Sequence, residues 1–98
     1  MPRVFTLVVH NADEPRQRYQ LEKAETILGR SPACDINLKD RFISSRHAMI
    51  RLSGDKIYIK DLGSSNETFV DNKPISEEVQ ITSGMVARLG PSTKFTIE

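Results

Sequence analysis

The chain has 98 residues, of which 38% are hydrophobic and 28% charged, which suits one globular domain over residues 1–98 and excludes a disordered chain. A formal net charge of +1 leaves no global positive field to hold nucleic acid, and no apolar run approaches the roughly 18 residues that a membrane span needs. The single cysteine, Cys34, excludes an internal disulfide and forms no zinc pattern with a nearby histidine.

These exclusions set the expected partners and compartment. We expect no metal, no cofactor, no nucleic-acid partner and no membrane insertion. The N-terminal sequence MPRVFTLVVHNADEP has too short an apolar run for a signal peptide and is typical of a strand followed by a loop. We therefore expect a cytoplasmic protein, or the cytoplasmic part of a longer one.

Short strand-like runs fill the chain, and no helix-length periodicity interrupts them. The clearest alternation lies on either side of Ser53-Gly54-Asp55, which predicts a β-hairpin. Further turns are predicted at Asp71–Pro74 and Thr82–Gly84. The strands expected in chain order are Arg3–Val9, Gln17–Leu21, Thr26–Leu28, Ile36–Leu38, Ala48–Leu52, Lys56–Leu62, Thr68–Val70, Val79–Ile81, Met85–Leu89 and Phe95–Ile97.

About ten or eleven short strands with a turn roughly every eight to twelve residues favour an antiparallel β-sandwich over a barrel or an α/β fold. Loops at one end of a sandwich lie together in space. We therefore expect the loops after Leu28, before His47 and around Asn66 to converge, although they are far apart in the sequence.

The first candidate feature is Gly29-Arg30, at the end of the third run. Glycine lets the backbone turn without a Cβ clash, and arginine offers a planar, permanently charged fork that matches an oxyanion. Most loop arginines are only solvated surface charges, so this pair alone is weak. The surrounding segment 30–46 is nevertheless basic, with Arg30, Lys39, Arg41 and Arg46 against Asp35 and Asp40.

The second feature is Ser44-Ser45-Arg46-His47, a short loop rich in hydrogen-bond donors, which suits an anion. A hydrolase is the alternative, with Ser44 or Ser45 as nucleophile, His47 as base and Asp61 as the third member. No Gly-x-Ser-x-Gly elbow is present, and a histidine so close to the nucleophile tends to point elsewhere. We therefore expect His47 to donate to a backbone carbonyl and stiffen the loop.

The third feature is the stretch Asp61–Thr68, with the sequence DLGSSNET. Serine and asparagine side chains in a turn usually bond their own backbone, which is the ordinary interpretation. An asparagine that projects from the turn can instead donate to and accept from a passing peptide backbone.

Together these stretches resemble the forkhead-associated domain, a β-sandwich related in fold to SMAD domains that binds phosphothreonine peptides. The family pattern is Gly-Arg, then Ser-x-x-His, then Ser/Thr-Asn-Gly with an aspartate upstream. The corresponding residues here are Gly29-Arg30, Ser44–His47, and Asp61 with Ser64-Ser65-Asn66. The resemblance covers roughly residues 3–98.

The resemblance implies a phosphothreonine-containing protein or peptide as partner, a role in signalling, and no catalysis. Arg30 would pair with the phosphate, Ser44 would donate its hydroxyl, Ser45 would add a donor, and Arg46 would be a second cation. The remaining roles implied are pocket lining by Ser65, a grip on the peptide backbone by Asn66, and structural support by Gly29, His47 and Asp61.

One position departs from the family pattern: Glu67 stands where glycine usually follows the asparagine. Glycine is favoured there if the turn needs positive φ, and a glutamate would then cost on the order of 1 kcal/mol. Its charge would also lie near a dianion. This departure supports a rival function, a phosphate-independent interaction or oligomerisation domain with a weakened loop site. Residues near Lys39–Phe42 and Val70–Lys73 are expected to choose the flanking peptide positions.

Overall fold

A computed structural model of the chain describes residues 5–10 and 15–98, which form eleven strands and no helix, so none of them belongs to a helix long enough to cross a membrane. The strands are β1 (Phe5–His10), β2 (Gln17–Leu21), β3 (Glu25–Gly29), β4 (Ile36–Asn37), β5 (Ala48–Ser53), β6 (Lys56–Asp61), β7 (Thr68–Val70), β8 (Lys73–Pro74), β9 (Val79–Ile81), β10 (Ala87–Leu89) and β11 (Thr93–Ile97). The predicted β-sandwich of about ten or eleven short strands is confirmed.

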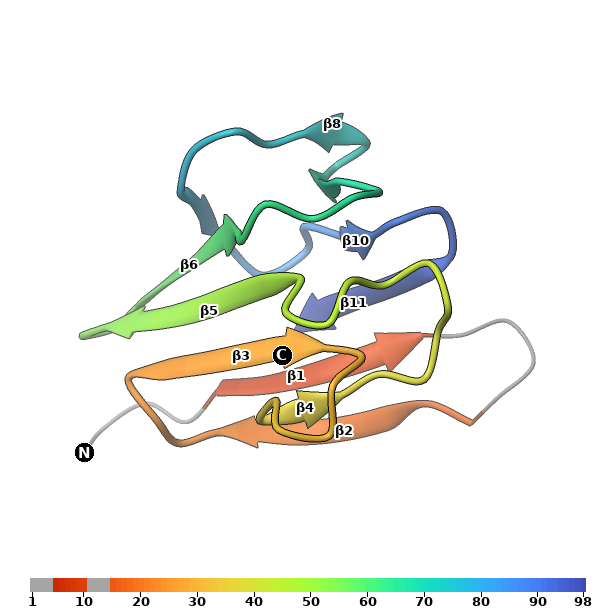
Figure 1. Cartoon of the computed structure of the whole chain (residues 1–98). Helices are drawn as coiled ribbons and strands as arrows, with labels where there is room; N and C mark the ends of the chain where they lie inside the picture. Colours follow the sequence, from red (N-terminus) through yellow and green to blue (C-terminus); the bar gives the residue numbers. More distant parts are fainter. Residues whose placement is uncertain (1–4, 11–14) are drawn as a thin grey trace.

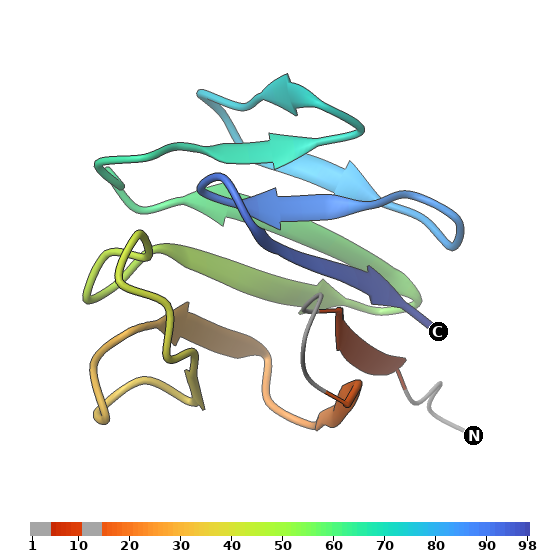
Figure 2. The same ribbon diagram turned by 90° about the vertical axis from the view of Figure 1, so that its right-hand side faces the viewer.

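Two sheets pack face to face (Figures 1 and 2). One has six strands in the order β2-β1-β11-β10-β7-β8, and the other has five in the order β4-β3-β5-β6-β9. The core between them is apolar, and its fully buried members include Leu7, Leu28, Ile50, Ile59 and Phe95. Each comes from a strand whose inward side chains alternate with more exposed ones, except in β1, where Leu7, Val8 and Val9 are all buried.

The β5–β6 hairpin has the shape that its sequence predicts. Ile50 lies opposite Ile59 and both are fully buried, so the register places the apolar residues of both strands on the core face. The turn uses Gly54 at φ +61°, a left-handed conformation that glycine adopts without a Cβ clash.

Several predicted boundaries change. The first predicted strand includes Arg3 and Val4, which lie outside the described residues, as does the loop at 11–14. The predicted turn Asp71–Pro74 is wrong in its second half, because Lys73–Pro74 form β8 beside β7. The run Met85–Leu89 is a strand only from Ala87, since the segment before it still belongs to the turn after β9.

One pairing departs from the antiparallel prediction. β4 runs parallel to β3, with Leu28 opposite Ile36 and Gly29 opposite Asn37. The segment between them folds back because the Asn37 side-chain amide donates to the Arg30 carbonyl (2.7 Å) and the Leu38 N–H donates to the Gly29 carbonyl (2.8 Å). These bonds hold the loop after β3 as a compact flap at one end of the sandwich.

Candidate functional site

Three loops begin at the same level of the five-stranded sheet. Ala48, at the start of β5, lies opposite both Leu28 of β3 and Asp61 of β6. The loops after β3, before β5 and after β6 therefore leave the sheet at the same end of these strands, and they lie toward the right of Figure 1 and on the left of Figure 2. This is the convergence expected around Arg30, Ser44 and Asn66.

Backbone hydrogen bonds join the first loop to the second. The Arg30 N–H donates to the Ser44 carbonyl (3.0 Å), and the Ser31 N–H donates to the Ser45 carbonyl (3.2 Å). The Cys34 thiol also donates to the Ser45 carbonyl, with an Sγ···O distance of 3.0 Å. These contacts fix the position of the Arg30 backbone relative to the two serines.

Gly29 is needed at this junction for a reason that differs from the prediction. Its φ is not in the left-handed region, so the turn itself does not require glycine. A Cβ at position 29 would instead overlap the Ser45 carbonyl oxygen and come within 2.8 Å of Cys34 Sγ. Glycine therefore allows the loop before β5 to pack directly on the end of β3.

The second loop is joined to the third through two side chains. Ser44 Oγ accepts a hydrogen bond from the Ser65 N–H (3.0 Å), and Asn66 Nδ2 donates to the Phe42 carbonyl (2.8 Å). Ser44 Oγ is the acceptor in this contact, and its own proton is donated to no group among the described residues. The hydroxyl group is thus positioned and still has a hydrogen bond to donate.

His47 lies beneath these loops and is fully buried. Its Nδ1 accepts the Ser44 N–H (3.1 Å), so the ring is the tautomer protonated on Nε2, which donates to the Glu67 carbonyl (2.9 Å). Both ring nitrogens are therefore occupied by backbone groups. Neither the serine hydroxyls nor Asp61 bonds the ring, and this geometry does not contain the nucleophile–base contact that the hydrolase alternative requires.

Asp61 organises the third loop from the end of β6. Its carboxylate accepts hydrogen bonds from the N–H groups of Gly63 (3.0 Å) and Ser64 (3.1 Å), from the Ser64 hydroxyl, and from the buried Thr68 hydroxyl (2.7 Å). Partial burial is the largest single influence on the pKa of Asp61, and it acts to raise that pKa because it disfavours the charged form. The hydrogen bonds to Ser64, Thr68 and Gly63 together outweigh it and lower the pKa of Asp61 below its usual range.

Glu67 adopts the positive φ that its position predicts, +66°. Its carbonyl accepts both the His47 ring N–H and the Gly90 N–H (3.0 Å), so two contacts hold the backbone in this left-handed conformation. The side chain is exposed and has no ion-pair partner among the described residues. The strain at this position is thus accompanied by a carboxylate at the surface of the loop cluster.

The loop end of the molecule carries an excess of unpaired positive charge. Both carboxylates of segment 30–46 are engaged, since Asp35 pairs with Lys23 and Asp40 accepts the Phe42 N–H (2.9 Å) and the Thr93 hydroxyl (2.7 Å). The Lys23 hydrogen bond, followed by that of the Ile27 N–H, lowers the pKa of Asp35. The exposed cations of the segment with no carboxylate partner in the described parts of the chain are Arg30, Lys39, Arg41 and Arg46.

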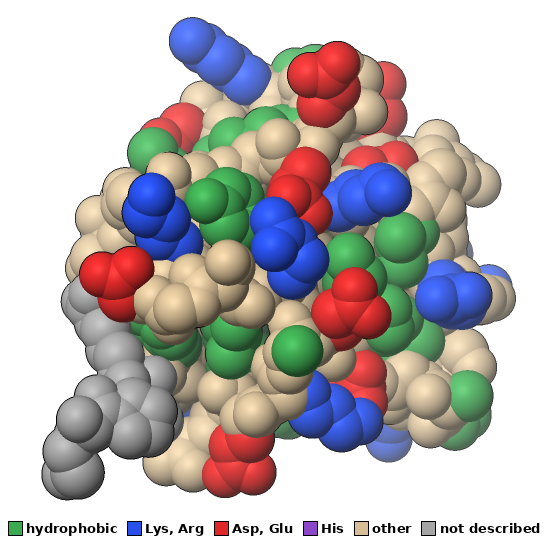
Figure 3. Space-filling view, turned by 90° about the vertical axis from the view of Figure 1, so that its left-hand side faces the viewer, with side chains coloured by type: hydrophobic (Ala, Val, Ile, Leu, Met, Phe, Trp, Pro, Cys, Tyr) green, Lys and Arg blue, Asp and Glu red, His purple; other side chains and the backbone are tan. Residues whose placement is uncertain are grey.

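The opposite end of the molecule has no such excess. Figure 3 shows that face, where lysine and arginine side chains alternate with aspartate and glutamate. The net charge of +1 therefore conceals an uneven distribution, with four cations that lack a carboxylate partner among the described residues gathered in segment 30–46.

Two supports of the site were not predicted. Asp40 shapes the second loop by bonding the N–H two residues ahead, and its bond to Thr93 anchors that loop to β11. An aspartate opening a turn is a recognisable signal for the first contact. Gly90 packs against the second and third loops, because a Cβ there would lie 3.3 Å from the Phe42 carbonyl and 3.5 Å from Asn66 Cβ. No local signal reveals a contact between residues so distant in sequence.

The assembled cluster can bind an anion. Ser44 offers a hydroxyl proton, and guanidinium groups come from Arg30 on the first loop and Arg46 on the second. Ser45 on the second loop and Ser65 on the third are exposed, and the second Nδ2 proton and the Oδ1 of Asn66 are without protein partners in the described ranges. Within residues 5–10 and 15–98 no three histidine, cysteine or acidic side chains lie close enough to hold a metal.

Comparison with protein families gives a match over most of the chain. The model of the FHA domain matches residues 26–90, which include all three loops. Among curated proteins, the glycogen accumulation regulator GarA of Mycolicibacterium smegmatis is 36% identical over 84 residues, covering 86% of this chain and 52% of GarA. The chain thus spans about half the length of this relative.

Solved structures match the whole fold. The FHA domain of CT664 from Chlamydia trachomatis superposes with a TM-score of 0.88 at 32% identity, covering 97% of this chain and 96% of that one. A domain solved in a structural and functional analysis of phosphothreonine-dependent FHA domain interactions superposes with a TM-score of 0.83 at 33% identity, covering 95% of each chain.

Proposed function

Because the chain belongs to the forkhead-associated (FHA) domain family, we propose that it binds phosphothreonine-containing proteins or peptides and so mediates phosphorylation-dependent protein–protein interaction in signalling. The observation that carries this proposal is the junction at Ser44. Its hydroxyl is fixed by the Ser65 N–H, keeps a proton to donate, and lies on the loop bonded to Arg30.

The phosphate-binding roles follow from which groups are still free. Arg30 and Arg46 would pair with the phosphate oxygens as charged donors, and the Ser44 hydroxyl would donate to a third oxygen. Ser45 would add its exposed hydroxyl beside them. A phosphothreonine carries about −1.5 to −2 charges near neutral pH, so charged donors suit it better than neutral ones.

The peptide backbone would be held by the third loop. Ser65 would line the pocket, and Asn66 would use its Oδ1 and second Nδ2 proton, since the first proton is bonded to Phe42. Gly29, His47 and Asp61 would act only as supports, because their interactions are with the protein itself. The single domain would bind without catalysing a reaction.

The expected affinity is micromolar. Each charge-assisted hydrogen bond contributes about 1.5–3 kcal/mol, and ordering the peptide costs part of that sum, which leaves roughly −8 kcal/mol. A niche for the threonine γ-methyl adds only about 1 kcal/mol, so discrimination against phosphoserine depends on a close fit. Such a module would work in the cytoplasm, in keeping with its free thiol.

The second candidate function is a phosphate-independent interaction domain, which Glu67 favours. Its exposed carboxylate belongs to the same loop as Asn66 and would repel a dianion if it turned toward the pocket. Screening by solvent and salt would remove most of this repulsion if it pointed outward.

Calorimetric titration separates the two functions. A degenerate phosphothreonine peptide library and its unphosphorylated twin are titrated against the wild type, Arg30→Ala and Lys56→Ala. The last variant is the matched control, because it removes an exposed cation at the start of β6. We expect micromolar binding of the phosphorylated library by the wild type and Lys56→Ala, and at least about tenfold weaker binding by Arg30→Ala. Equal binding of the two libraries would reject the phosphate function.

A second substitution isolates the departure at position 67. We expect Glu67→Gly to raise the free energy of unfolding by about 1 kcal/mol, since glycine adopts φ +66° without strain, and to tighten phosphopeptide binding. Glu67→Asn removes the charge but keeps a side chain that tolerates this conformation. Unchanged or weaker phosphopeptide binding by both variants would show that Glu67 does not hinder the site.

A further inference from the structure

The strand β2 leaves one edge of the six-stranded sheet open. It is the terminal strand of that sheet, paired only with β1, and it forms the lower margin of the molecule in Figure 1. The loop cluster uses no residue of this strand. An open strand edge is a template for pairing with another strand.

The direction of the free backbone groups follows from the neighbouring strands. Thr6 exchanges two backbone hydrogen bonds with Glu98, on the side of β1 that is remote from β2. The backbone N–H and C=O groups of successive residues point to opposite sides of a strand, so those of Leu7 point toward β2. Leu7 lies opposite Tyr19, whose backbone groups therefore point to β1. Those of Arg18 and Gln20 point to the open side, where they have no partner within the described ranges.

The sequence around this strand is self-complementary in charge. Arg16 and Glu22 lie three residues before and three residues after Tyr19, and both are exposed. Neither forms an ion pair in the chain as far as it is described. If two such strands ran antiparallel and were centred on Tyr19, each Arg16 would face the Glu22 of the other strand.

We propose that a second copy of this chain pairs antiparallel with β2 along this open edge, joining the two six-stranded sheets across a two-fold axis at Tyr19. In that register Arg18 of one copy lies opposite Gln20 of the other, so the unpaired backbone groups of both residues exchange hydrogen bonds. Tyr19 then faces Tyr19 of the other copy in a non-hydrogen-bonded pair, where side chains approach most closely.

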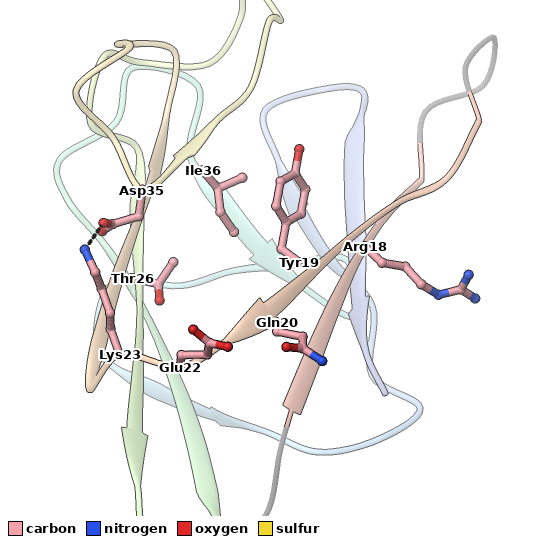
Figure 4. A pocket seen from close by; sticks show the side chains of 8 residues that line it. All are labelled: Arg18, Tyr19, Gln20, Glu22, Lys23, Thr26, Asp35 and Ile36. Carbon is pink, nitrogen blue, oxygen red and sulfur yellow. Dashed lines mark hydrogen bonds and ion pairs between the residues drawn. The ribbon is translucent and has the colours of Figure 1, made fainter.

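A groove beside the strand supports the same arrangement. It has a volume of about 550 Å³ and lies between β2 and the facing strands β3 and β4 (Figure 4). Tyr19 and Ile36 point into it from opposite sheets, and Thr26, only 6% exposed, has no side-chain hydrogen bond. In the proposed dimer the second Tyr19 would lie at the mouth of this groove and cover apolar surface there.

Two of the usual protections of an edge strand are absent from β2. Proline within the strand and inward-pointing charges prevent edge pairing in many sheets. The core-facing side chains of β2 are instead those of Tyr19 and Leu21, both uncharged. Its one charged residue, Arg18, lies on the outer face and pairs with Glu98 (3.4 Å), so it leaves the backbone edge unobstructed.

Sedimentation velocity of the full chain tests the proposal through charge reversal. Single variants Arg16→Glu and Glu22→Arg should each weaken dimerisation about tenfold, because like charges then face each other twice. The double variant Arg16→Glu/Glu22→Arg should restore the wild-type dissociation constant within about threefold. Controls are Lys56→Glu and Glu77→Arg, at exposed unpaired positions away from β2, which should change nothing.

A backbone variant and a concentration limit complete the test. Gln20→Pro removes an N–H that points to the open side, so the monomer should keep its fold and its phosphopeptide binding while dimerisation is lost. A wild type that stays monomeric at about 1 mM would overturn the proposal, whether or not an unlike strand binds the edge. So would a dimer whose stability is equally insensitive to both single reversals.

Discussion

His47 shows how one buried side chain holds two loops of this domain together. Its ring joins the Ser44 N–H to the Glu67 carbonyl. We expect His47→Ala to lower the free energy of unfolding by about 2–4 kcal/mol, because it leaves a cavity and two unpaired backbone groups. Phosphopeptide binding should weaken as well, since Ser44 and Glu67 lose their common support.

Urea denaturation followed by circular dichroism measures this loss. His10→Ala is the matched control, because His10 is only half-buried and has one side-chain hydrogen bond, to Thr96 (3.0 Å). Its effect should be clearly smaller. Equal losses for the two variants would contradict the bridging role of His47.

Asp61 makes the stability of the domain depend on pH in a defined direction. Its pKa is lowered in the folded state, so its stabilising contribution is present above the unfolded pKa of about 3.9 and is lost as pH falls through the folded value. We expect Asp61→Asn to reduce the free energy of unfolding by about 1–3 kcal/mol at neutral pH. The difference from the wild type should shrink below about pH 4.

Unfolding curves at a series of pH values check this prediction. Asp55→Asn serves as the control, because Asp55 is exposed in the β5–β6 turn and its carboxylate accepts no hydrogen bond from the described residues. If the free energy of unfolding of the wild type exceeded that of Asp61→Asn by the same amount down to pH 2, the charge of the Asp61 carboxylate would not contribute to stability.

Single residues were predictable where local chemistry decides the outcome. The positive φ of Glu67 follows from the turn that replaces Asn-Gly. The need for Gly29 was foreseen, but its cause was not, because the clash is with the Ser45 carbonyl, sixteen positions away in the sequence. Likewise, the bond from Asn66 to the Phe42 carbonyl depends on how two loops meet.

The strands follow the sequence where alternation is long and turns are strong. The β5–β6 hairpin has both, and its predicted turn lies within one residue of the observed one. β8 was not predicted, because it has only two residues and one of them is Pro74, a residue typical of turns. Proline fits here because β8 is the edge strand of its sheet. The parallel pairing of β3 with β4 was not predictable, because no sequence pattern indicates it over so short a connection.

The turn between β7 and β8 allows a prediction at the same scale. Asp71 and Asn72 both have positive φ, +50° and +67°, and Asp71 also accepts the Val86 N–H (3.0 Å). We expect Asn72→Val to lower the free energy of unfolding by about 1–2 kcal/mol, because β-branched residues fit this conformation poorly. Asn72→Gly should be neutral or stabilising.

Thermal unfolding of both variants provides the measurement. Gln80→Val, in strand β9, is a suitable control, since a β-branched residue suits an exposed strand position. If Asn72→Val lowered the free energy of unfolding no more than Gln80→Val does, the positive φ at position 72 would not limit stability.

For the whole molecule, the uneven charge predicts a difference between binding and stability. Four cations without a carboxylate partner among the described residues lie on the loop segment 30–46, whereas the opposite face has mixed charges. We expect phosphopeptide affinity to fall severalfold between about 0.05 and 0.5 M salt, while the unfolding midpoint changes little. Titrations at several salt concentrations measure this, and Arg30→Ala should show a shallower dependence. A salt-independent affinity would argue against charged phosphate contacts.

The two hydrogen bonds that the Glu67 carbonyl accepts have a kinetic consequence. The His47 ring and the Gly90 N–H hold the third loop from opposite sheets before any ligand arrives. A peptide therefore meets a rim that needs no rearrangement, so the rate of complex formation should depend on diffusion and electrostatic attraction. Peptides of different sequence should then have similar association rate constants and differ mainly in their dissociation rate constants.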